Sequence, residues 1–380
     1  MSKYIFYWAP FFSNIATSMA VINSAISLKK FSKNHYEPVI IDVFGEWQDH
    51  LELINKHHIK IEKLNLDSHF SDKKINGFFK SRLFQIKIFL FAFIPLLNLL
   101  KKKKTDVFVL HLVTSLPLFL NFIFTLKTEM ILRISGLPKL NIFRKIFWKI
   151  VLKKISVITT PTISTQSFIK NKIKNKPIFL LRDPILNIGN IKKNKLNKNI
   201  MNNKFLAMGR LTKQKNFLFL LKCFQLIIKK NPKINLFILG EGEEFHRLKN
   251  FIKTNNLEKN IFLEGYKKNI YDYLLDSKAF ILSSLWEDPG FVLIEAAYSN
   301  TTIISSDCNN GPKEILNNGK NGFIFNSNDK KNFLEVFNNF QLSSRREIYE
   351  KKLNAKKMSR KFTLFNHYLE IQKILNSYEK

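Results

Sequence analysis

The sequence has little cysteine, few acidic residues and no long apolar run, and each shortage excludes a class of protein. Two cysteines, Cys223 and Cys308, cannot form the disulfide framework of a small secreted domain, so they favour a reducing compartment. The first residues, Met1 to Pro10, lack the basic start, the long apolar run and the small-residue cleavage site of a signal peptide. We therefore expect a cytoplasmic protein.

The shortage of acidic residues leaves a formal charge of +33, from 62 lysines and arginines against 29 aspartates and glutamates. Such a charge affects association and not fold. Attraction to anionic lipid headgroups and binding of nucleic acid are two functional interpretations. The alternative is compositional drift, because Lys, Asn, Ile and Phe are all abundant. No aromatic–basic cluster or nucleic-acid module is visible, so we expect no nucleic-acid partner.

The best candidate for a membrane span, residues 88–100, is interrupted by Pro95 and bounded by Lys87 and Lys101. It is well short of the ~20 residues that a spanning helix needs. Two interpretations stay open. The segment is either a buried core helix or an interfacial helix whose lysines meet lipid phosphates, with peripheral contact at the inner face of the plasma membrane.

What is present is enough for two domains: 380 residues, of which 45% are hydrophobic. Strand-like runs alternate with helical patterns in both halves, which predicts an α/β fold of βαβ units with parallel sheets. An Asn- and Lys-rich segment, 187–203, is typical of a linker. We expect domains 1–190 and 191–360, and a C-terminal helix, 361–380, that packs back toward the N-terminal domain. The predicted strands are residues 4–8, 38–43, 107–110, 130–134 and 157–160, then 205–208, 235–239, 260–263, 279–282 and 302–304.

Each predicted strand of the second half ends in a polar or glycine-containing loop. In a parallel sheet these loops emerge at one edge, where ligands of open α/β folds bind. The sequence therefore predicts a ligand site at that edge. The loops are Gly209-Arg210, Gly240-Glu241-Gly242, Glu264-Gly265, Ser283-Ser284 and Ser305-Ser306-Asp307.

The densest signal is the segment 283–296, where a strand leads through Asp288-Pro289-Gly290 into a predicted helix. Amides at a helix start lack acceptors and suit a diphosphate. Glu287 stands in the loop before the helix. The side chain of Glu295 is expected to point toward the N-terminus of the helix, and so toward the same pocket. An ordinary structural role is the alternative for two glutamates at this spacing. Glu287 would then cap the helix electrostatically, and Glu295 would be a solvated helix residue. The apolar neighbours of Glu295 argue against this, because an unpaired charge among them is costly.

Glu287 and Glu295, with seven residues between them, resemble the paired glutamates of retaining GT-B glycosyltransferases of family 4, the glycosyl transferases group 1. The similarity runs in order through residues 205–325, from Gly209-Arg210-Leu211 and Gln214-Lys215-Asn216 to Gly311-Pro312-Lys313-Glu314-Ile315. It implies a GT-B fold, in which two Rossmann-like parallel-sheet domains face a central cleft. The first domain would bind the acceptor and the second the nucleotide sugar.

The resemblance also implies roles for the residues that match. Arg210 and Lys215 would neutralise the donor diphosphate as charge grows on the leaving group. Glu295 would hold the ribose and Glu287 the hydroxyls of the transferred sugar. Such enzymes transfer the sugar with retention by front-side attack, so no covalent intermediate on Glu287 is expected. The other donor-binding residues would be Gly290, Phe291, Gly209, Gly240 and Gly265.

The first half departs from the family pattern in two places. The first loop, Phe11 to Thr17, lacks the usual glycines, and no histidine follows the later strand near Arg133. Candidates for the acceptor or sugar side are His111, Arg133, Ser135, Gly136 and Asn14. A packed histidine at His111 and a structural turn at Ser135-Gly136 are equally open interpretations.

No metal site or cofactor is expected, because the sequence has no Asp-x-Asp motif and its histidines lack ligand spacing. The leading hypothesis is a glycosyltransferase that moves a sugar from a nucleotide sugar, with UDP as the expected nucleotide, to a glycan or lipid-linked acceptor in surface polysaccharide biosynthesis. One alternative is a nucleotide-sugar epimerase of the same fold. Another is a basic non-enzymatic protein that binds membrane or nucleic acid.

Overall fold

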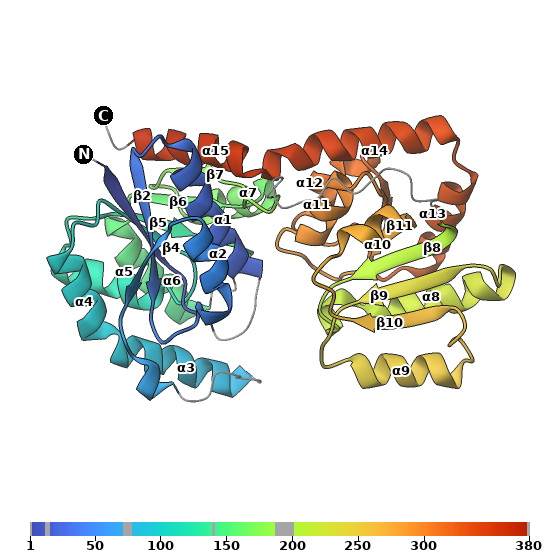
Figure 1. Cartoon of the computed structure of the whole chain (residues 1–380), viewed down its shortest axis with the longest axis horizontal. Coiled ribbons are helices and arrows are strands. Elements are labelled where there is room, and N and C mark those ends of the chain that lie inside the picture. Colours follow the sequence, from blue (N-terminus) through green and yellow to red (C-terminus); the bar gives the residue numbers. More distant parts are fainter. Residues whose placement is uncertain (1, 12–15, 71–77, 139–140, 187–200, 378–380) are drawn as a thin grey trace. The chain divides into compact units, whose positions relative to one another are not determined.

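The computed structural model describes residues 2–11, 16–70, 78–138, 141–186 and 201–377. The chain divides into two compact units, residues 1–185 with 364–380 and residues 186–363 (Figure 1). Most of the predicted linker, residues 187–200, lies outside the described residues. Residues 201–203 of that segment form the start of strand β8.

The first unit is built on a seven-stranded parallel sheet in the order β3-β2-β1-β4-β5-β6-β7. The chain winds outward from β1 in one direction and from β4 in the other, so the order reverses between these two central strands. The strands are β1 Lys3–Trp8, β2 Tyr36–Asp42, β3 Lys60–Lys63, β4 Val107–Leu110, β5 Glu129–Arg133, β6 Val157–Thr160 and β7 Ile178–Leu180.

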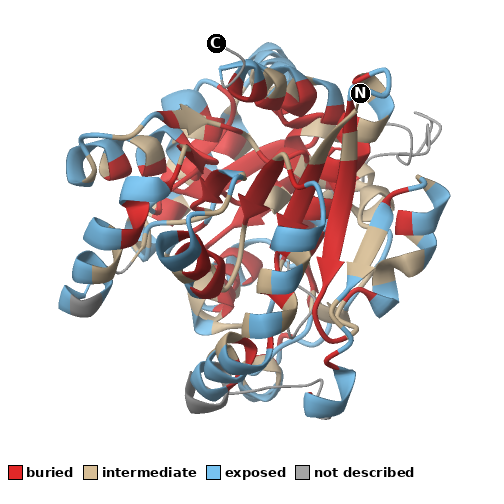
Figure 2. Ribbon diagram, turned by 90° about the vertical axis from the view of Figure 1, so that its left-hand side faces the viewer, coloured by how far each residue is buried: buried red, intermediate tan, exposed pale blue. Residues whose placement is uncertain are grey.

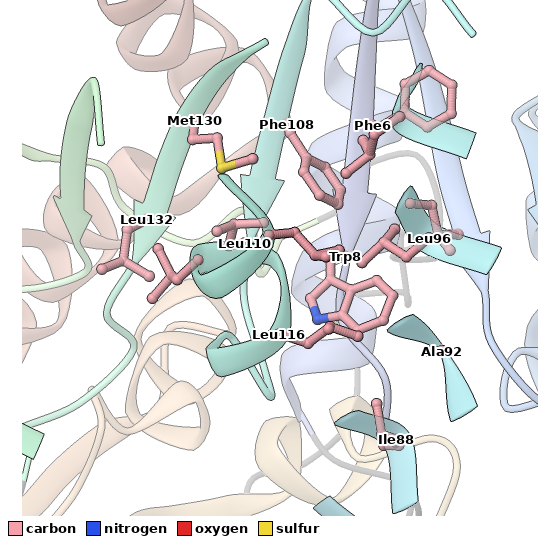
Figure 3. Close-up of a cluster of buried hydrophobic side chains, with 14 of the residues drawn as sticks. Phe6, Trp8, Ile88, Ala92, Leu96, Phe108, Leu110, Leu116, Met130 and Leu132 are labelled. Carbon is pink, nitrogen blue, oxygen red and sulfur yellow. The ribbon is translucent and has the colours of Figure 1, made fainter. Parts of the chain in front are cut away.

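Both faces of this sheet are covered, because alternate residues of a strand point to opposite sides. Phe108 and Leu110 of β4 join one core with Ile88 and Leu96 (Figure 3). Val107 and Val109 join the other core, together with residues from both ends of the chain. The helices on the first face are α3 Phe78–Phe91, α4 Phe93–Lys102, α5 Ser115–Phe124, α6 Ile142–Val151 and α7 Ile163–Lys172, and those on the second are α1 Ala16–Phe31, α2 Leu51–Lys56 and α15 Leu364–Asn376. Short 3-10 turns are η1 Gln48–His50, η2 Asp67–His69 and η3 Leu152–Lys154.

The second unit is built on a six-stranded parallel sheet in the order β10-β9-β8-β11-β12-β13. The strands are β8 Met201–Met208, β9 Asn235–Leu239, β10 Ile261–Gly265, β11 Ser277–Leu282, β12 Thr302–Ser306 and β13 Phe323–Phe325. The helices are α8 Phe217–Lys230, α9 Phe245–Thr254, α10 Tyr271–Leu275, α11 Phe291–Tyr298, α12 Pro312–Ile315, α13 Lys330–Leu342 and α14 Arg345–Ser359, with 3-10 turns η4 Lys213–Lys215, η5 Asn317–Gly319 and η6 Arg360–Phe362. Figure 2, which faces the first unit, shows the strands of that unit's sheet buried and the outer faces of its helices exposed. The predicted fold of two Rossmann-like parallel-sheet domains is confirmed.

The apolar segment 88–100 forms the end of α3 and most of α4. Its side chains divide between two environments: Ile88 and Leu96 are buried in the core, whereas Leu90 and Ile94 are exposed. No single helix within the described ranges is long and apolar enough to cross a membrane. Only the bent pair Arg82–Phe91 and Phe93–Lys102, which meets at 48°, has the required length and composition when taken together.

Candidate functional site

The loops after β8, β9 and β10 pack together, backbone against backbone. The Gly209 amide donates to the Leu239 carbonyl at 3.0 Å, and the Gly240 amide donates to the Gly265 carbonyl at 2.8 Å. Gly240 has φ +135°, and a Cβ there would lie 2.0 Å from the Gly209 carbonyl oxygen. Only glycine fits such an approach. The three predicted loop glycines are therefore neighbours at the carboxyl edge of the sheet.

Lys215 enters the site along the first of these loops. Its aliphatic chain passes Gly209, where a Cβ would lie 2.8 Å from the Lys215 Cε. Its Nζ lies 2.6 Å from Glu287 Oε1, and the two side chains are only 13% and 5% exposed. Two opposite charges are thus held together out of water, where each depends on the other for its stability.

Glu287 is held by its side chain and by its backbone. Oε1 accepts a second hydrogen bond, from Ser284 Oγ at 2.5 Å, and the Glu287 amide donates to the Asn309 carbonyl at 3.1 Å. Oε2 accepts no hydrogen bond from the described residues. One carboxylate oxygen is therefore fixed by the protein, and the other is left for a ligand hydroxyl.

The turn before α11 is fixed by contacts from the next loop of the sheet. Asn310 Nδ2 donates to Asp288 Oδ1, and a Cβ on Gly311 would lie 1.9 Å from the Pro289 carbonyl oxygen. Gly290 then caps the helix with φ +95°, and Phe291 is its first residue. The first hydrogen bond of α11 runs from the Leu293 amide to the Gly290 carbonyl at 3.0 Å, so the amides of Phe291 and Val292 precede it and can bind an anion at this edge.

Glu295 lies one turn into α11 and is partly buried. Burial raises the pKa of Glu295 to about 7, and the Lys215 ammonium opposes this rise. Burial also raises the pKa of the Tyr271 hydroxyl, and the Glu295 carboxylate adds to that rise. Lys215 therefore acts electrostatically on both glutamates. Arg210 is placed differently, because its side chain is exposed and makes no ion pair within the described residues.

The structure brings two of the predicted acceptor-side residues together in the first unit. His111 and Arg133 follow or end the adjacent strands β4 and β5. Burial lowers the pKa of His111 well below its usual value, and Arg133 and His367 lower it further. Arg133 is itself engaged: its guanidinium donates at 2.5 Å both to the Leu181 carbonyl and to Asp183 Oδ1.

The remaining acceptor-side candidates are not grouped with His111 and Arg133. Ser135 and Gly136 lie in the loop after β5 and are partly buried. Asn14 lies outside the described residues. The structure thus groups His111 with Arg133 and leaves Ser135 and Gly136 as backbone and hydroxyl groups of an adjoining loop.

Sequence reasoning missed the polar residues that surround His111 and Arg133. His367 of α15 bonds Ser24 Oγ through Nε2 at 2.8 Å and the Arg182 carbonyl through Nδ1 at 2.6 Å. Ser24 is 343 residues away from His367 in the chain, so no local pattern could join them. Asp183 follows β7, a three-residue strand that was not predicted, and the charged dipeptide Arg182-Asp183 was its only signal.

Within the described residues, no group of three or more His, Cys, Asp and Glu side chains is arranged to hold a metal ion. The Lys215 ammonium places a positive charge near Glu287 and Glu295, and Arg210 stands in the same loop.

Comparison with known proteins assigns the family. Residues 190–361 match the model of the family described as glycosyl transferases group 1. An uncharacterized glycosyltransferase of Methanocaldococcus jannaschii is 32% identical over 312 residues, which cover 76% of this chain and 73% of that protein. The chain belongs to the group 1 glycosyltransferases. The family indicated by the paired glutamates is confirmed at this level.

Two further proteins are similar to this glycosyltransferase. The Escherichia coli enzyme named UDP-Gal:alpha-D-GlcNAc-diphosphoundecaprenol alpha-1,3-galactosyltransferase is 32% identical over 156 residues, 40% of each chain. The crystal structure of Anabaena HepE in complex with UDP superposes with a TM-score of 0.71 at 15% identity, over 99% of this chain and 100% of that one. At that identity the likeness concerns the fold, which is GT-B.

Proposed function

We propose that this glycosyltransferase moves a hexose-type sugar from a UDP-sugar, with retention of configuration, to a glycan or lipid-linked acceptor in surface polysaccharide biosynthesis. The observation that carries the proposal is the position of Lys215, paired with Glu287 and acting on Glu295 beside the start of α11. Two comparisons support it. HepE was crystallised with UDP, and the E. coli relative is named for a UDP-sugar donor and a diphosphoundecaprenol-linked acceptor.

In this proposal the diphosphate of the donor binds the first amides of α11, near Gly290 and Phe291. Lys215 and Arg210 stabilise the negative charge that grows on the departing UDP, which lowers the barrier to departure. No metal ion is required for that step. The acceptor hydroxyl attacks from the face that UDP leaves, and its proton passes to the leaving phosphate oxygen.

The two glutamates hold different parts of the donor. Glu295 accepts hydrogen bonds from the ribose hydroxyls, and these bonds favour its ionised form against the burial that raises its pKa. Glu287 offers Oε2 to the hydroxyls of the transferred sugar while Lys215 and Ser284 fix Oε1. Glu287 is therefore a positioning carboxylate and not a nucleophile.

The first unit supplies the acceptor side, through His111, Ser135 and Gly136. His111 stays neutral at physiological pH because burial lowers its pKa, so it can exchange a hydrogen bond with an acceptor hydroxyl without carrying charge. Arg133 orders this region through Asp183. We place the enzyme at the cytoplasmic face of the plasma membrane, in peripheral contact with anionic lipid, where a lipid-linked acceptor would be presented.

The test is donor consumption by the full chain with a panel of UDP-, GDP- and ADP-sugars, with and without a chelator. We expect a UDP-sugar to be hydrolysed slowly and the rate to survive chelation. Glu287→Gln should lower turnover about a hundredfold or more, since it keeps the shape but loses the charge that positions the sugar. Glu335→Gln, on the exposed side of α13, is the matched control and should have no effect.

Three outcomes would reject parts of the proposal. If no nucleotide sugar is bound or consumed, the enzyme assignment of this site is wrong. If chelation abolishes turnover and added Mg²⁺ restores it, a metal is required. If the donor is converted to a different nucleotide sugar without an acceptor, the epimerase alternative holds.

A further inference from the structure

The first unit contains a second site that the proposed transfer reaction does not use. A cavity of about 590 Å³ lies between α6 and the segment that links α7 to β7. Among the described residues, no acidic side chain lines it. Its walls include six lysines: Lys145, Lys149, Lys153, Lys172, Lys174 and Lys176.

The topology separates this cavity from the acceptor-side residues. Helix α6 begins after the carboxyl end of β5 and runs back to the amino end of β6. The cavity is lined by α6 from Lys145 onward, by Leu152 and Lys153 of η3 and by residues 172–176, which lead into the amino end of β7. His111 and Arg133 lie at the carboxyl ends of their strands. The cavity therefore lies at the opposite edge of the sheet, away from the residues assigned to transfer.

Among the described residues, five of the six lysines have neither a carboxylate partner nor a hydrogen-bond acceptor for their ammonium group. Lys145, Lys149, Lys153, Lys172 and Lys174 make no ion pair within the described residues. Elsewhere in the same unit, by contrast, Lys29 pairs with Glu37 at 2.8 Å. These five lysines are exposed around the cavity and their positive charges add there, so an anion at the cavity would be attracted.

Lys176 has a structural part in the same cavity. Its Nζ donates to the carbonyls of Lys153 and Ile155, each at 2.8 Å. Burial lowers its pKa. These bonds tie the segment before β7 to the end of η3, so the cavity walls are held in place without any ligand. The five unpaired lysines are the ones free to meet an anion.

An apolar surface adjoins the cavity and indicates which kind of anion binds there. On α6, Ile142, Ile146 and Ile150 are 70%, 56% and 41% exposed. Their spacing of four residues places them along one stripe, next to Lys145 and Lys149. The neighbouring end of α5 also exposes Phe122, Ile123 and Phe124. Exposed apolar side chains beside lysines suit the boundary between lipid headgroups and acyl chains, and a soluble anion would leave them in water.

We propose that this cavity binds the phosphate of an anionic membrane lipid while the isoleucine stripe of α6 enters the acyl region. The lysines favour a phosphate, and the exposed isoleucines beside them commit the surface to a bilayer. The inference rests on the proposed peripheral contact with membrane and names its site. It assigns the contact to α6 and not to the segment 88–100.

The experiment is co-sedimentation of the full chain with vesicles of phosphatidylcholine alone or mixed with phosphatidylglycerol, at low and at physiological salt. The chain should sediment only with the anionic vesicles, and less at higher salt. The triple variant Lys145→Gln/Lys149→Gln/Lys153→Gln should lose about a hundredfold in partition, since each lysine near an anionic surface contributes roughly fivefold. The matched control is Lys229→Gln/Lys230→Gln/Lys233→Gln, which removes the same charge from the second unit and should lose far less.

Three further measurements distinguish lipid binding at the cavity from general charge attraction and from binding of a soluble anion. Ile146→Ser should weaken vesicle binding without changing its salt dependence, because it removes apolar contact and no charge. If both triple variants lose vesicle binding equally, the attraction is a general effect of net charge, and the assignment of the site to the cavity is wrong. If soluble glycerol phosphate stabilises the wild-type chain but not the cavity variant, and vesicles do not bind, the ligand is a soluble anion and the lipid proposal is wrong.

UDP binding, measured on the same variants, keeps the two proposals apart. Cavity variants that still bind UDP are folded, so their loss of vesicle binding supports the cavity. If vesicle binding is lost in the cavity variant but UDP does not bind even to the wild-type chain, the donor proposal is wrong and the lipid proposal stands.

Discussion

Lys215 and Glu287 depend on each other at the level of single side chains. Both are almost fully buried, and their charged atoms are 2.6 Å apart. Removing one partner leaves the other charge buried without compensation, which costs about 3–5 kcal/mol. We expect Lys215→Met to lower the free energy of unfolding by an amount in that range, and Lys215→Met/Glu287→Gln to recover most of it. Urea denaturation of the single and double variants measures this coupling. Additive losses would contradict a buried pair.

Glu295 gives the site a dependence on pH. Burial raises its pKa in the folded chain to about 7, above the ordinary value of 4.5. A raised pKa means that the folded state binds a proton that the unfolded state has released. The resulting stability is fully present below pH 4.5 and is lost as pH rises from 4.5 to 7, by up to about 3 kcal/mol.

Glu295→Gln should therefore remove a pH-dependent part of the free energy of unfolding between pH 4.5 and 7. The measurement is chemical denaturation of wild type and variant across that range, and the difference between them isolates Glu295 from other titrating groups. Glu335→Gln serves again as the control. A difference that stays flat across the range would show that Glu295 is solvated and ordinary.

At the scale of elements, the donor site depends on loops that approach more closely than side chains allow. Gly240→Ala would place a Cβ 2.0 Å from the Gly209 carbonyl oxygen, at φ +135°. Gly319→Ala is a matched control, since its φ is +95° but nothing lies within 4 Å of the added atom. We expect Gly319→Ala to cost about 1 kcal/mol from its backbone conformation alone. Gly240→Ala should cost clearly more and abolish UDP binding, as followed by thermal unfolding with and without UDP.

The central strands could be predicted from the sequence, and three edge strands could not. The strands β3, β7 and β13 lie at sheet edges and are only three or four residues long. β3 carries two lysines and a glutamate among its four residues, whereas β7 and β13 are wholly apolar but only three residues long. None of the three therefore stands out as a strand in the sequence. The loops that follow the central strands of the second sheet were predicted because each carries its own glycine or hydroxyl signal.

The donor-side residues could be found locally, whereas the polar cluster of the first unit could not. Glu287 and Glu295 stand eight positions apart on one loop and helix, so their pattern is visible in the sequence. Arg133 is paired with Asp183, 50 residues away, and Ser24 with His367, 343 residues away. Such contacts arise only when β5, β7, α1 and α15 are packed together. The sequence therefore predicted candidates there, but not what they touch.

Across the whole molecule, the basic residues behind the charge of +33 lie in different environments. Lys215 is buried with a carboxylate, Lys176 donates to backbone carbonyls, and the remaining cavity lysines make no ion pair with any residue that the structure describes. Compositional drift explains a basic surface in general. It does not explain why unpaired lysines line one cavity beside an exposed isoleucine stripe. We propose that the charge serves donor binding in one unit and lipid binding in the other.

The central claim, that the second unit holds a UDP-sugar at Lys215, is tested most directly by titration calorimetry of UDP into the full chain. We expect one site per chain, with affinity reduced at least about tenfold in Lys215→Met because a charge-assisted contact to the diphosphate is lost. Lys222→Met, an exposed lysine of α8, should bind as wild type does. Absence of UDP binding to the folded wild type, or equal affinity in wild type and Lys215→Met, would contradict the account.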